Sequence, residues 1–306
     1  MNNYLFVLGR DRNLSLLELV SYLKRKGMDY KSVKITDTYA EFQIQDFNPF
    51  NSIKELGGIV KIAEFIDINK IKIEKNKILF GLTIFYNDIR LISQLYELFK
   101  KEKVKAIQKK PRKVFFSPKE SKKLDLELFI FKNKIAKVIV NSNPSEFKAR
   151  DETRPYFDKL KVTSLRLSKI LVNLSQVNEN ETLLDPFVGA GSILQEAMIL
   201  GINVVGTDID KKSSEGAVKN LEFIKNKYRL RTSFKIHNID NSEIGKVIEK
   251  VDGVATEPYF GPFFLKIPKY EEVLKIIDEV EKIYYSLLLK LKKILPKNSL
   301  AVFPVP

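Results

Sequence analysis

A loop at residues 185–191 carries the clearest chemical signal of the sequence. It reads Asp-Pro-Phe-Val-Gly-Ala-Gly between a strand-like and a helix-like segment, which is where a doubly wound α/β sheet places its ligand loop. Gly189 and Gly191 would let the backbone approach a ligand closely, but Leu194 stands where a dinucleotide fingerprint has its third glycine. The carboxylate of Asp185 would repel a pyrophosphate, whereas it suits a ligand that carries an ammonium and a sulfonium group. The loop therefore favours S-adenosylmethionine over NAD as the cofactor.

Two more carboxylates follow the next two predicted strands. Asp208 lies 23 positions after Asp185, close to the interval of about 20 residues at which an acid meets ribose hydroxyls. Asp240 follows the third strand, where it could accept a hydrogen bond from an adenine amino group, and Asp210 is expected to cap the helix that comes after it. Ligands bind at the carboxyl ends of parallel strands, so these acids are expected to share one site. The predicted cofactor-binding residues are Asp185, Pro186, Phe187, Gly189, Gly191, Asp208 and Asp240.

The composition excludes several kinds of chemistry. The chain of 306 residues has no cysteine and one histidine, His237, so thiolate zinc sites, cysteine nucleophiles and multi-histidine metal sites are excluded, and no metal is expected. No apolar run approaches the roughly 18 residues of a membrane span, and the N-terminus lacks the basic start and cleavage site of a secretory signal. We therefore expect a cytoplasmic protein without membrane association, whose oligomeric state the sequence leaves open.

Positive charge is the strongest feature of the N-terminal half. The formal net charge of +15 attracts polyanions, of which nucleic acid is the commonest. Residues 101–123 contain ten Lys or Arg and two acids, together with Phe115 and Phe116, which could stack on bases or belong to the core. A charge run can also be only a solvated face. We predict RNA or DNA contact by the basic segment, residues 109–113, through Lys109, Lys110, Arg112 and Lys113.

Alternating strand-like and helix-like segments predict an α/β fold for the N-terminal half. Residues 1–68 are expected to form a ferredoxin-like unit, in which a helix begins at the capping-box residue Ser15 and strand-like segments cover 32–44 and 60–68. Residues 69–145 form a second α/β unit, in which a strand and a helix precede the basic segment and two strands joined by a turn follow it.

The C-terminal half shows longer α/β repeats. Residues 146–164 are rich in Pro, Asn and charge and are expected to form a linker. Five continuous apolar strands alternate with helices over residues 165–306, the pattern of a parallel sheet that helices cover on both faces. The last strand is expected over residues 299–306.

A Thr-Glu-Pro-Tyr loop at residues 256–259 follows the fourth of these strands. Together with the loop at 185–191 and Gly-Thr-Asp-Ile-Asp at 206–210, it resembles the S-adenosylmethionine-dependent amino-methyltransferases, whose fourth-strand motif is Asp/Asn-Pro-Pro-Tyr. The segment YLFVLGRDRNLSLLEL at 4–19 and ARDETRP at 149–155 are similar to the tRNA guanosine-10 N2-methyltransferases, which carry an N-terminal ferredoxin-like unit and a THUMP domain.

The resemblance implies a fold and a reaction. It implies a Rossmann-like methyltransferase sheet over residues 165–306, a THUMP-like RNA-binding domain over 69–145, tRNA as the partner and methyl transfer to the exocyclic N2 amine of a guanosine. Such sheets usually have seven strands, whereas five are counted here, so the final antiparallel hairpin is expected to be absent. The chain would then be truncated, genuinely short or paired with another subunit.

The resemblance also implies roles for the Thr-Glu-Pro-Tyr loop. The Thr256 side chain and the Glu257 carbonyl would accept the amine hydrogens, Pro258 would shape the turn and Tyr259 would stack on the base. Thr256 replaces the Asp or Asn of the family, and Glu257 replaces its first Pro. A hydroxyl accepts hydrogen bonds more weakly than a carboxylate, and the side chain of Glu257 offers an alternative source of that charge.

Two other functions stay open at this point. An adenine-N6 DNA methyltransferase is one, although the basic N-terminal half argues for RNA. A non-catalytic RNA-binding protein with a degenerate methyltransferase domain is the other, and Thr256 and Glu257 favour it. The retained Asp185, Asp208 and Asp240 oppose it, because a dead site has no reason to keep its cofactor ligands.

Overall fold

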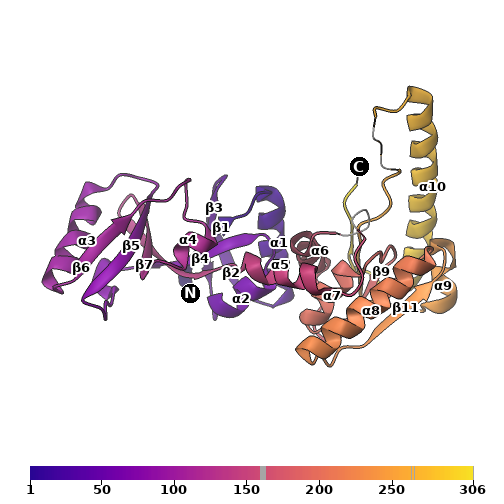
Figure 1. The fold of residues 1–306 in the computed structure, drawn as a ribbon, viewed down its shortest axis with the longest axis horizontal. Coiled ribbons are helices and arrows are strands. Elements are labelled where there is room, and N and C mark those ends of the chain that lie inside the picture. Colours follow the sequence, from indigo (N-terminus) through magenta and orange to yellow (C-terminus); the bar gives the residue numbers. More distant parts are fainter. Residues whose placement is uncertain (159–162, 263, 265, 306) are drawn as a thin grey trace. The chain divides into compact units, whose positions relative to one another are not determined.

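The computed structural model describes residues 1–158, 163–262, 264 and 266–305, and it divides into two compact units (Figure 1). Unit 1 contains residues 1–19 and 27–146, and unit 2 contains residues 20–26 and the described residues from 147 onward. Residues 159–162 of the predicted linker, residues 263 and 265, and Pro306 of the predicted last strand lie outside the described residues.

Unit 1 is built on one sheet, which has eight strands within the described residues, in the order β2-β3-β1-β4-β8-β7-β5-β6. The strands are β1 (Asn2–Leu8), β2 (Tyr30–Ile35), β3 (Tyr39–Ile44), β4 (Ile59–Ile66), β5 (Lys77–Ile84), β6 (Lys105–Lys109), β7 (Leu126–Phe131) and β8 (Lys134–Asn141). The helices along residues 1–121 are α1 (Arg12–Arg25), α2 (Pro49–Glu55), the short 3-10 helix η1 (Ile68–Lys70), α3 (Ile89–Lys101) and α4 (Pro118–Ser121).

Segments of both predicted N-terminal units share this sheet. Strands β4 and β8 pair antiparallel, with Phe65 opposite Ala136. A buried apolar cluster crosses the same junction and includes Leu5 of β1, Ala63 of β4 and Phe129 of β7. This cluster buries apolar side chains from both predicted N-terminal units. That burial stabilises the eight strands as a single sheet.

Three parts of unit 1 differ from the prediction. Helix α1 begins at Arg12 and not at Ser15, whose hydroxyl donates to the Asp11 carbonyl (2.6 Å), and the Glu18 carboxylate accepts from the Gly57 and Gly58 amides, so the predicted capping box is absent. Residues 32–44, expected as one strand-like segment, form β2 and β3 instead, and the Thr36 hydroxyl donates to the Tyr39 carbonyl (2.9 Å) in the turn between them. Strand β6 was not predicted, because Lys105 and Lys109 at its two ends mask the short apolar centre. It lies at the edge of the sheet, parallel to β5, where exposed lysines discourage further strand pairing.

Unit 2 confirms the predicted Rossmann-like α/β architecture. Its described residues form a sheet of five strands in the order β11-β10-β9-β12-β13, and all four neighbouring pairs are parallel. The strands are β9 (Thr182–Asp185), β10 (Asn203–Asp208), β11 (Phe234–Asn238), β12 (Gly253–Ala255) and β13 (Ala301–Val302). The helices are α5 (Pro144–Thr153), α6 (Leu165–Ser175), α7 (Ser192–Ile199), α8 (Lys211–Tyr228), the 3-10 helix η2 (Asn241–Glu243), α9 (Ile244–Val247) and α10 (Tyr270–Ile294). Strand β13 is shorter than the predicted 299–306.

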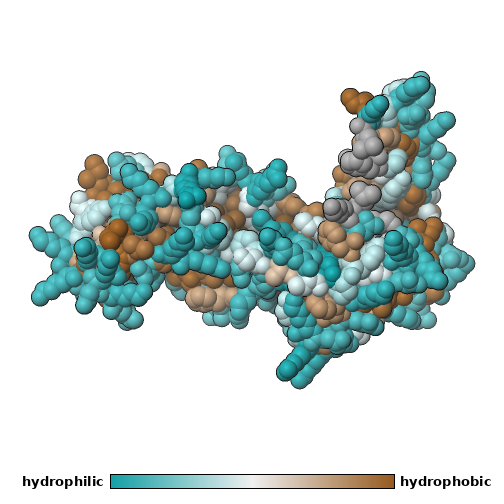
Figure 2. All heavy atoms as spheres, in the orientation of Figure 1, coloured by the Kyte–Doolittle hydropathy of each residue, from teal (hydrophilic) through white to brown (hydrophobic). Residues whose placement is uncertain are grey.

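Alternate side chains of the strands supply two separate cores, one on each face of the sheet. Leu183 packs with apolar residues of α6, α7 and α8, whereas its neighbour Leu184 packs with those of α9 and α10. Successive strand side chains point to opposite faces, so two adjacent leucines anchor helices on both sides. Hydrophilic side chains predominate on the face that Figure 2 shows. Leu274 and Ile277 of α10 are exposed hydrophobic residues.

Candidate functional site

A cavity of about 820 Å³ opens at the carboxyl ends of the strands of unit 2. We refer to it as the carboxyl-edge cavity, and its walls come from residues 185–189, 208–210, 240–242 and 257–261, with contributions from Thr163, Ser192, Ile193 and α10. Parallel strands bring these segments together because all their carboxyl ends meet at one edge. The predicted site residues that line the cavity are Asp185, Pro186, Phe187, Gly189, Asp208, Asp240, Glu257, Pro258 and Tyr259. Gly191 and Thr256 are not among the lining residues.

The glycines of the loop at 185–191 have the backbone that the sequence suggested. Gly189 and Gly191 have φ angles of 50° and 79°, a region in which other residues are strained. Gly191 begins α7 as its N-cap residue. On β10, a Cβ at Gly206 would lie 2.8 Å from the Val188 side chain, so the absence of a side chain there leaves room for the loop.

Asp185 is the most perturbed acid of the site. It is 1% exposed and accepts hydrogen bonds from the Thr256 hydroxyl (2.6 Å) and the Phe187 amide (3.1 Å). Burial raises the pKa of Asp185 to about 7, an effect that the two hydrogen bonds oppose and the charges of Asp208 and Glu257 reinforce. A cationic group placed in the cavity would favour the ionised form of this carboxylate.

Asp208 fastens the loop to the second strand. Its Oδ2 accepts from the Gly189 amide (2.9 Å), and its Oδ1 accepts from the Asp210 amide (2.9 Å). Each carboxylate oxygen has a further lone pair that a ligand hydroxyl could use. Asp210 caps α8 by accepting from the Lys212 amide (3.0 Å), which confirms its predicted role as a helix cap.

Asp240 also caps a helix while it lines the cavity. Its carboxylate accepts from the Ser242 amide (2.8 Å) at the start of η2. Hydrogen bonds from the Ser242 side chain and backbone lower the pKa of Asp240, so this acid stays ionised more readily than Asp185. The three acids expected to share one site therefore lie around the same cavity.

The Thr-Glu-Pro-Tyr loop presents its side chains in different directions. Thr256 is fully buried and its hydroxyl donates to Asp185, whereas Glu257 lines the carboxyl-edge cavity and accepts a hydrogen bond from the Thr163 hydroxyl. Tyr259 is 39% exposed in the cavity wall, and its carbonyl accepts from the Tyr284 hydroxyl of α10 (3.1 Å). Thr256, the expected acceptor of amine hydrogens, therefore points towards Asp185 and does not line the cavity.

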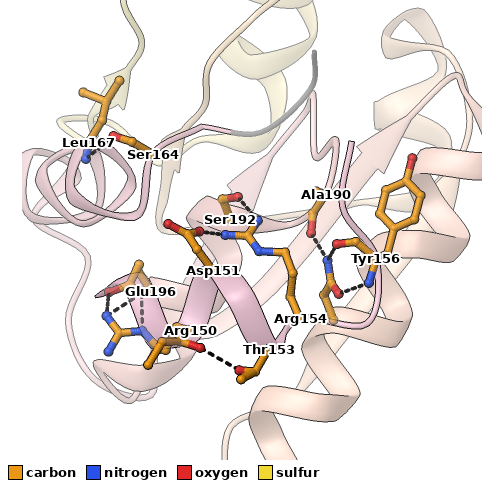
Figure 3. Close-up of polar contacts among 12 residues, drawn as sticks. Arg150, Asp151, Thr153, Arg154, Tyr156, Ser164, Leu167, Ala190, Ser192 and Glu196 are labelled. Atoms are coloured by element: carbon orange, nitrogen blue, oxygen red, sulfur yellow. Dashed lines mark hydrogen bonds and ion pairs between the residues drawn. The ribbon is translucent and has the colours of Figure 1, made fainter. Parts of the chain in front are cut away.

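A buried ion cluster links α5, α6 and α7, and it was not predicted from the sequence. Arg150 of α5 forms a two-pronged contact with Glu196 of α7, with 3.1 Å for each hydrogen bond (Figure 3). Lys169 of α6 pairs with the same carboxylate at 3.2 Å. All three side chains are at most 3% exposed. The start of the predicted linker is therefore a helix that is anchored to the methyltransferase-like sheet.

Further contacts lead from the end of this helix to the cavity. Arg154 donates to the hydroxyl of Ser192 (3.1 Å), a residue of the cavity wall (Figure 3). The Tyr156 amide donates to Asn220 (2.9 Å), whose side-chain nitrogen donates to the Ala190 carbonyl (2.9 Å) inside the loop at 185–191. The signal that could have revealed these contacts is the pair of arginines four positions apart in ARDETRP, which suits one face of a helix.

The basic segment lies in unit 1, at the end of β6 and in the residues that follow. All four of its predicted RNA-contacting side chains are exposed. Phe116 is 3% exposed and Phe115 packs against Phe85 with ring centroids 5.6 Å apart. These two aromatics therefore belong to the core, and they are not free to stack on bases.

The described residues contain neither a cluster of metal-binding side chains nor a membrane-spanning helix. Neither the cavity nor any other described part of the chain has three or more His, Cys, Asp or Glu side chains grouped to hold a metal ion. Among the described residues, no helix combines the length and the apolar character that a membrane crossing needs.

Comparisons with known proteins converge on methyl transfer. The family UPF0020, described as an RMKL-like methyltransferase domain, matches residues 154–303. The tRNA (guanine(10)-N2)-dimethyltransferase of Methanothermobacter thermautotrophicus is 39% identical over 113 residues, which are 37% of this chain and 32% of that protein. That of Methanocaldococcus jannaschii is 34% identical over 123 residues, or 38% and 34% of the two chains. The matches to these two relatives thus span about a third of their length.

One shorter relative is covered more fully. The probable tRNA (guanine(10)-N2)-dimethyltransferase of Methanothermococcus thermolithotrophicus is 30% identical over 119 residues, which are 38% of this chain and 74% of that protein. Among solved structures, the crystal structure of TrmN from Thermus thermophilus is similar in fold, with a TM-score of 0.53, 12% identity and coverage of 98% of this chain and 89% of that one.

Proposed function

The chain belongs to the methyltransferase family that includes the tRNA (guanine(10)-N2)-dimethyltransferases, and from this premise we propose that it transfers a methyl group from S-adenosylmethionine to the exocyclic N2 amine of a guanosine in tRNA. The observation that carries the proposal is the carboxyl-edge cavity. It gathers Asp185, Asp208 and Asp240 from three successive strand ends and sets Glu257 and Tyr259 beside them.

The cavity fits S-adenosylmethionine by its residues and its size. Asp185 would pair with the ammonium group, Asp208 would accept from the ribose hydroxyls and Asp240 from the adenine amino group. The conformation of Gly189 lets the loop backbone lie close to the ligand. A volume of about 820 Å³ lies within the usual range of small-molecule sites, roughly 300–1,000 Å³. When bound, the cofactor supplies a methyl group activated by a sulfonium.

The protein's own contribution is to position and desolvate the amine. Tyr259 would stack on the target base, Pro258 would shape the turn that presents it, and the Glu257 carbonyl would accept an amine hydrogen. The hydrogen bond from Tyr284 to the Tyr259 carbonyl holds this loop against α10. The nitrogen lone pair then forms the new N–C bond, the C–S bonding pair returns to sulfur, and the nitrogen loses one proton.

Unit 1 would hold the tRNA. Its exposed basic segment offers four cations for phosphate contacts, and residues 69–145 would act as a THUMP-like RNA-binding region. Phosphate contacts position an RNA without reading its sequence, so the choice of nucleotide falls to the carboxyl-edge cavity.

A second candidate function is a non-catalytic protein that binds RNA and the cofactor. The observation in its favour is Thr256, which is buried against Asp185 and leaves the loop without the side-chain acceptor of its relatives' motif. Binding of the cofactor without transfer to any RNA is the outcome that this candidate predicts.

Methyl-labelled S-adenosylmethionine and unmodified bulk tRNA would separate the two candidates. We expect label in tRNA and little in duplex DNA, with at least a tenfold loss for Tyr259→Ala because the base loses its stacking partner. Tyr285→Ala is the matched control, since Tyr285 is a 66% exposed residue of α10 that does not line the cavity. Cofactor binding without label in any RNA would favour the non-catalytic candidate.

A further inference from the structure

Six carboxylates line the carboxyl-edge cavity within the described residues, and they differ in the element that carries them and in what they contact; Glu279 belongs to α10. Asp185 is engaged by Thr256, Asp208 fastens the loop, and Asp210 and Asp240 cap helices. Glu257 is different, because it projects into the cavity from the Thr-Glu-Pro-Tyr loop itself, two residues before Tyr259. Thr256, the residue before it, donates to Asp185 (2.6 Å), which places Glu257 near the predicted cofactor ligand Asp185.

The orientation of Glu257 is set by a contact from outside the loop. Thr163, which immediately precedes the N-cap residue Ser164 of α6, donates its hydroxyl hydrogen to Glu257 Oε2. That bond leaves Glu257 Oε1 and the second lone pair of Oε2 able to accept from a ligand. An ionised carboxylate only accepts hydrogen bonds, so its natural partner is a group with two neighbouring donors.

The bases differ in whether they offer such a pair of donors. Guanine presents N1–H beside the N2 amino group on its Watson–Crick edge. Adenine and cytosine present a ring-nitrogen acceptor beside their amino group, and uracil presents one N–H between two carbonyl acceptors. A carboxylate facing that edge therefore accepts twice from guanine, whereas it meets a lone pair in adenine or cytosine.

We propose that Glu257 is the residue that selects guanine, by accepting from N1–H and from the N2 amine with its side-chain carboxylate, and that Thr163 positions it. This inference rests on the proposed function, from which it takes guanine as the substrate base. It differs in the roles that it assigns to Thr256 and Glu257 of the Thr-Glu-Pro-Tyr loop. Thr256 supports the cofactor ligand Asp185, and Glu257 supplies the side-chain acceptor. The carboxylate also lies against the nitrogen that gains positive charge as the N–C bond forms, and it can receive the proton that this nitrogen releases.

Base recognition can be measured without methyl transfer. The probes are guanosine and 2-aminopurine riboside, which keeps the 2-amino group but has an acceptor at N1. Their affinities for the whole protein saturated with S-adenosylhomocysteine would be compared by NMR saturation transfer. We expect the wild-type protein to prefer guanosine by about 10- to 100-fold, the discrimination typical of a two-bond base contact.

Variants assign that preference to a residue. Glu257→Gln replaces one acceptor by a donor and should reduce or invert the preference, while the affinity for S-adenosylhomocysteine shows that the protein is folded. Thr163→Val should weaken the preference and Thr163→Ser should restore it. Glu281→Gln is the matched control, because Glu281 is an exposed residue of α10 that does not line the cavity, and it should leave the preference unchanged.

The outcomes separate this inference from the proposed function. A guanosine preference that Glu257→Gln abolishes supports the inference even if no RNA is methylated, a result that would reject the proposed enzyme alone. Equal affinities for the two nucleosides, no guanosine binding, or a preference that Glu281→Gln lowers as much as Glu257→Gln would overturn the role of Glu257 even if tRNA is methylated.

Discussion

The buried carboxylate of Asp185 predicts a pH-dependent cofactor affinity. Its pKa is raised to about 7 by burial, so the carboxylate is about three-quarters ionised at pH 7.5 and about 3% ionised at pH 5.5. If the ammonium of the cofactor pairs only with the ionised form, affinity falls about 25-fold over this interval, or about 1.9 kcal/mol. Isothermal titration with S-adenosylhomocysteine between pH 5.5 and 7.5 would measure the change.

Asp185→Asn is the control for this pH dependence. It keeps an oxygen that can accept from Thr256 but has no charge, so we expect weaker binding, by about 1.5–3 kcal/mol at pH 7.5, and a nearly flat pH profile. The raised pKa of Asp185 also makes the stability of the ligand-free protein depend on pH. A carboxyl whose pKa is raised on folding stabilises the fold below its unfolded pKa, and this contribution is lost as the pH rises through about 7. Equal pH profiles for wild type and variant would refute the assignment of Asp185.

Three other predictions test the supports of the site and the RNA contact. Glu196→Gln removes the negative charge that Arg150 and Lys169 share, and urea denaturation should show a loss of about 3–5 kcal/mol; an unchanged midpoint would contradict the role of the cluster. Gly216→Ala places a Cβ against the ring of Tyr156, so the overpacking cost of about 1–3 kcal/mol should outweigh the helix-propensity gain of about 1 kcal/mol, and a rise in Tm would show the contact to be absent. Alanine at the four cations of the basic segment should lower the slope of log tRNA affinity against log salt by up to about 3; an equal slope in filter binding would remove this segment from the interface.

Much of unit 2 could be predicted because its signals are local. Continuous apolar strands and the intervening amphipathic helices follow from the sequence pattern, and the structure places them as expected. The loop at 185–191 was also recognisable, since its two glycines mark a backbone that needs positive φ. The cap at Asp210 followed from residue type and position.

The arrangement of unit 1 depends on contacts between distant residues. Strands β4 and β8 are separated by most of the unit in sequence, and their register, with Lys61 opposite Asn141, has no local signature. Strand β6 was missed for a related reason, because lysines at its ends outweigh two apolar residues in a sequence pattern. Its place is set by pairing with β5.

Side-chain direction limited what could be predicted about the site. The acids at the strand ends were identified, and they do line one cavity. The direction of Thr256 towards Asp185 could not be predicted, since neighbouring strand residues face opposite sides and the sequence does not show which side the turn selects. The burial of Arg150 against Glu196 could not be predicted either. An arginine within a charged stretch of sequence is usually a solvated surface residue.

The most direct test of the central claim is the identity of the methylated nucleoside. The whole protein would be incubated with methyl-labelled S-adenosylmethionine and unmodified tRNA, and the RNA would be digested to nucleosides and separated by chromatography with mass detection. We predict label in N2-methylguanosine or N2,N2-dimethylguanosine, at levels that fall with Glu257→Gln and persist with Glu281→Gln. Label confined to a ring nitrogen, to another base or to a ribose hydroxyl would contradict the account.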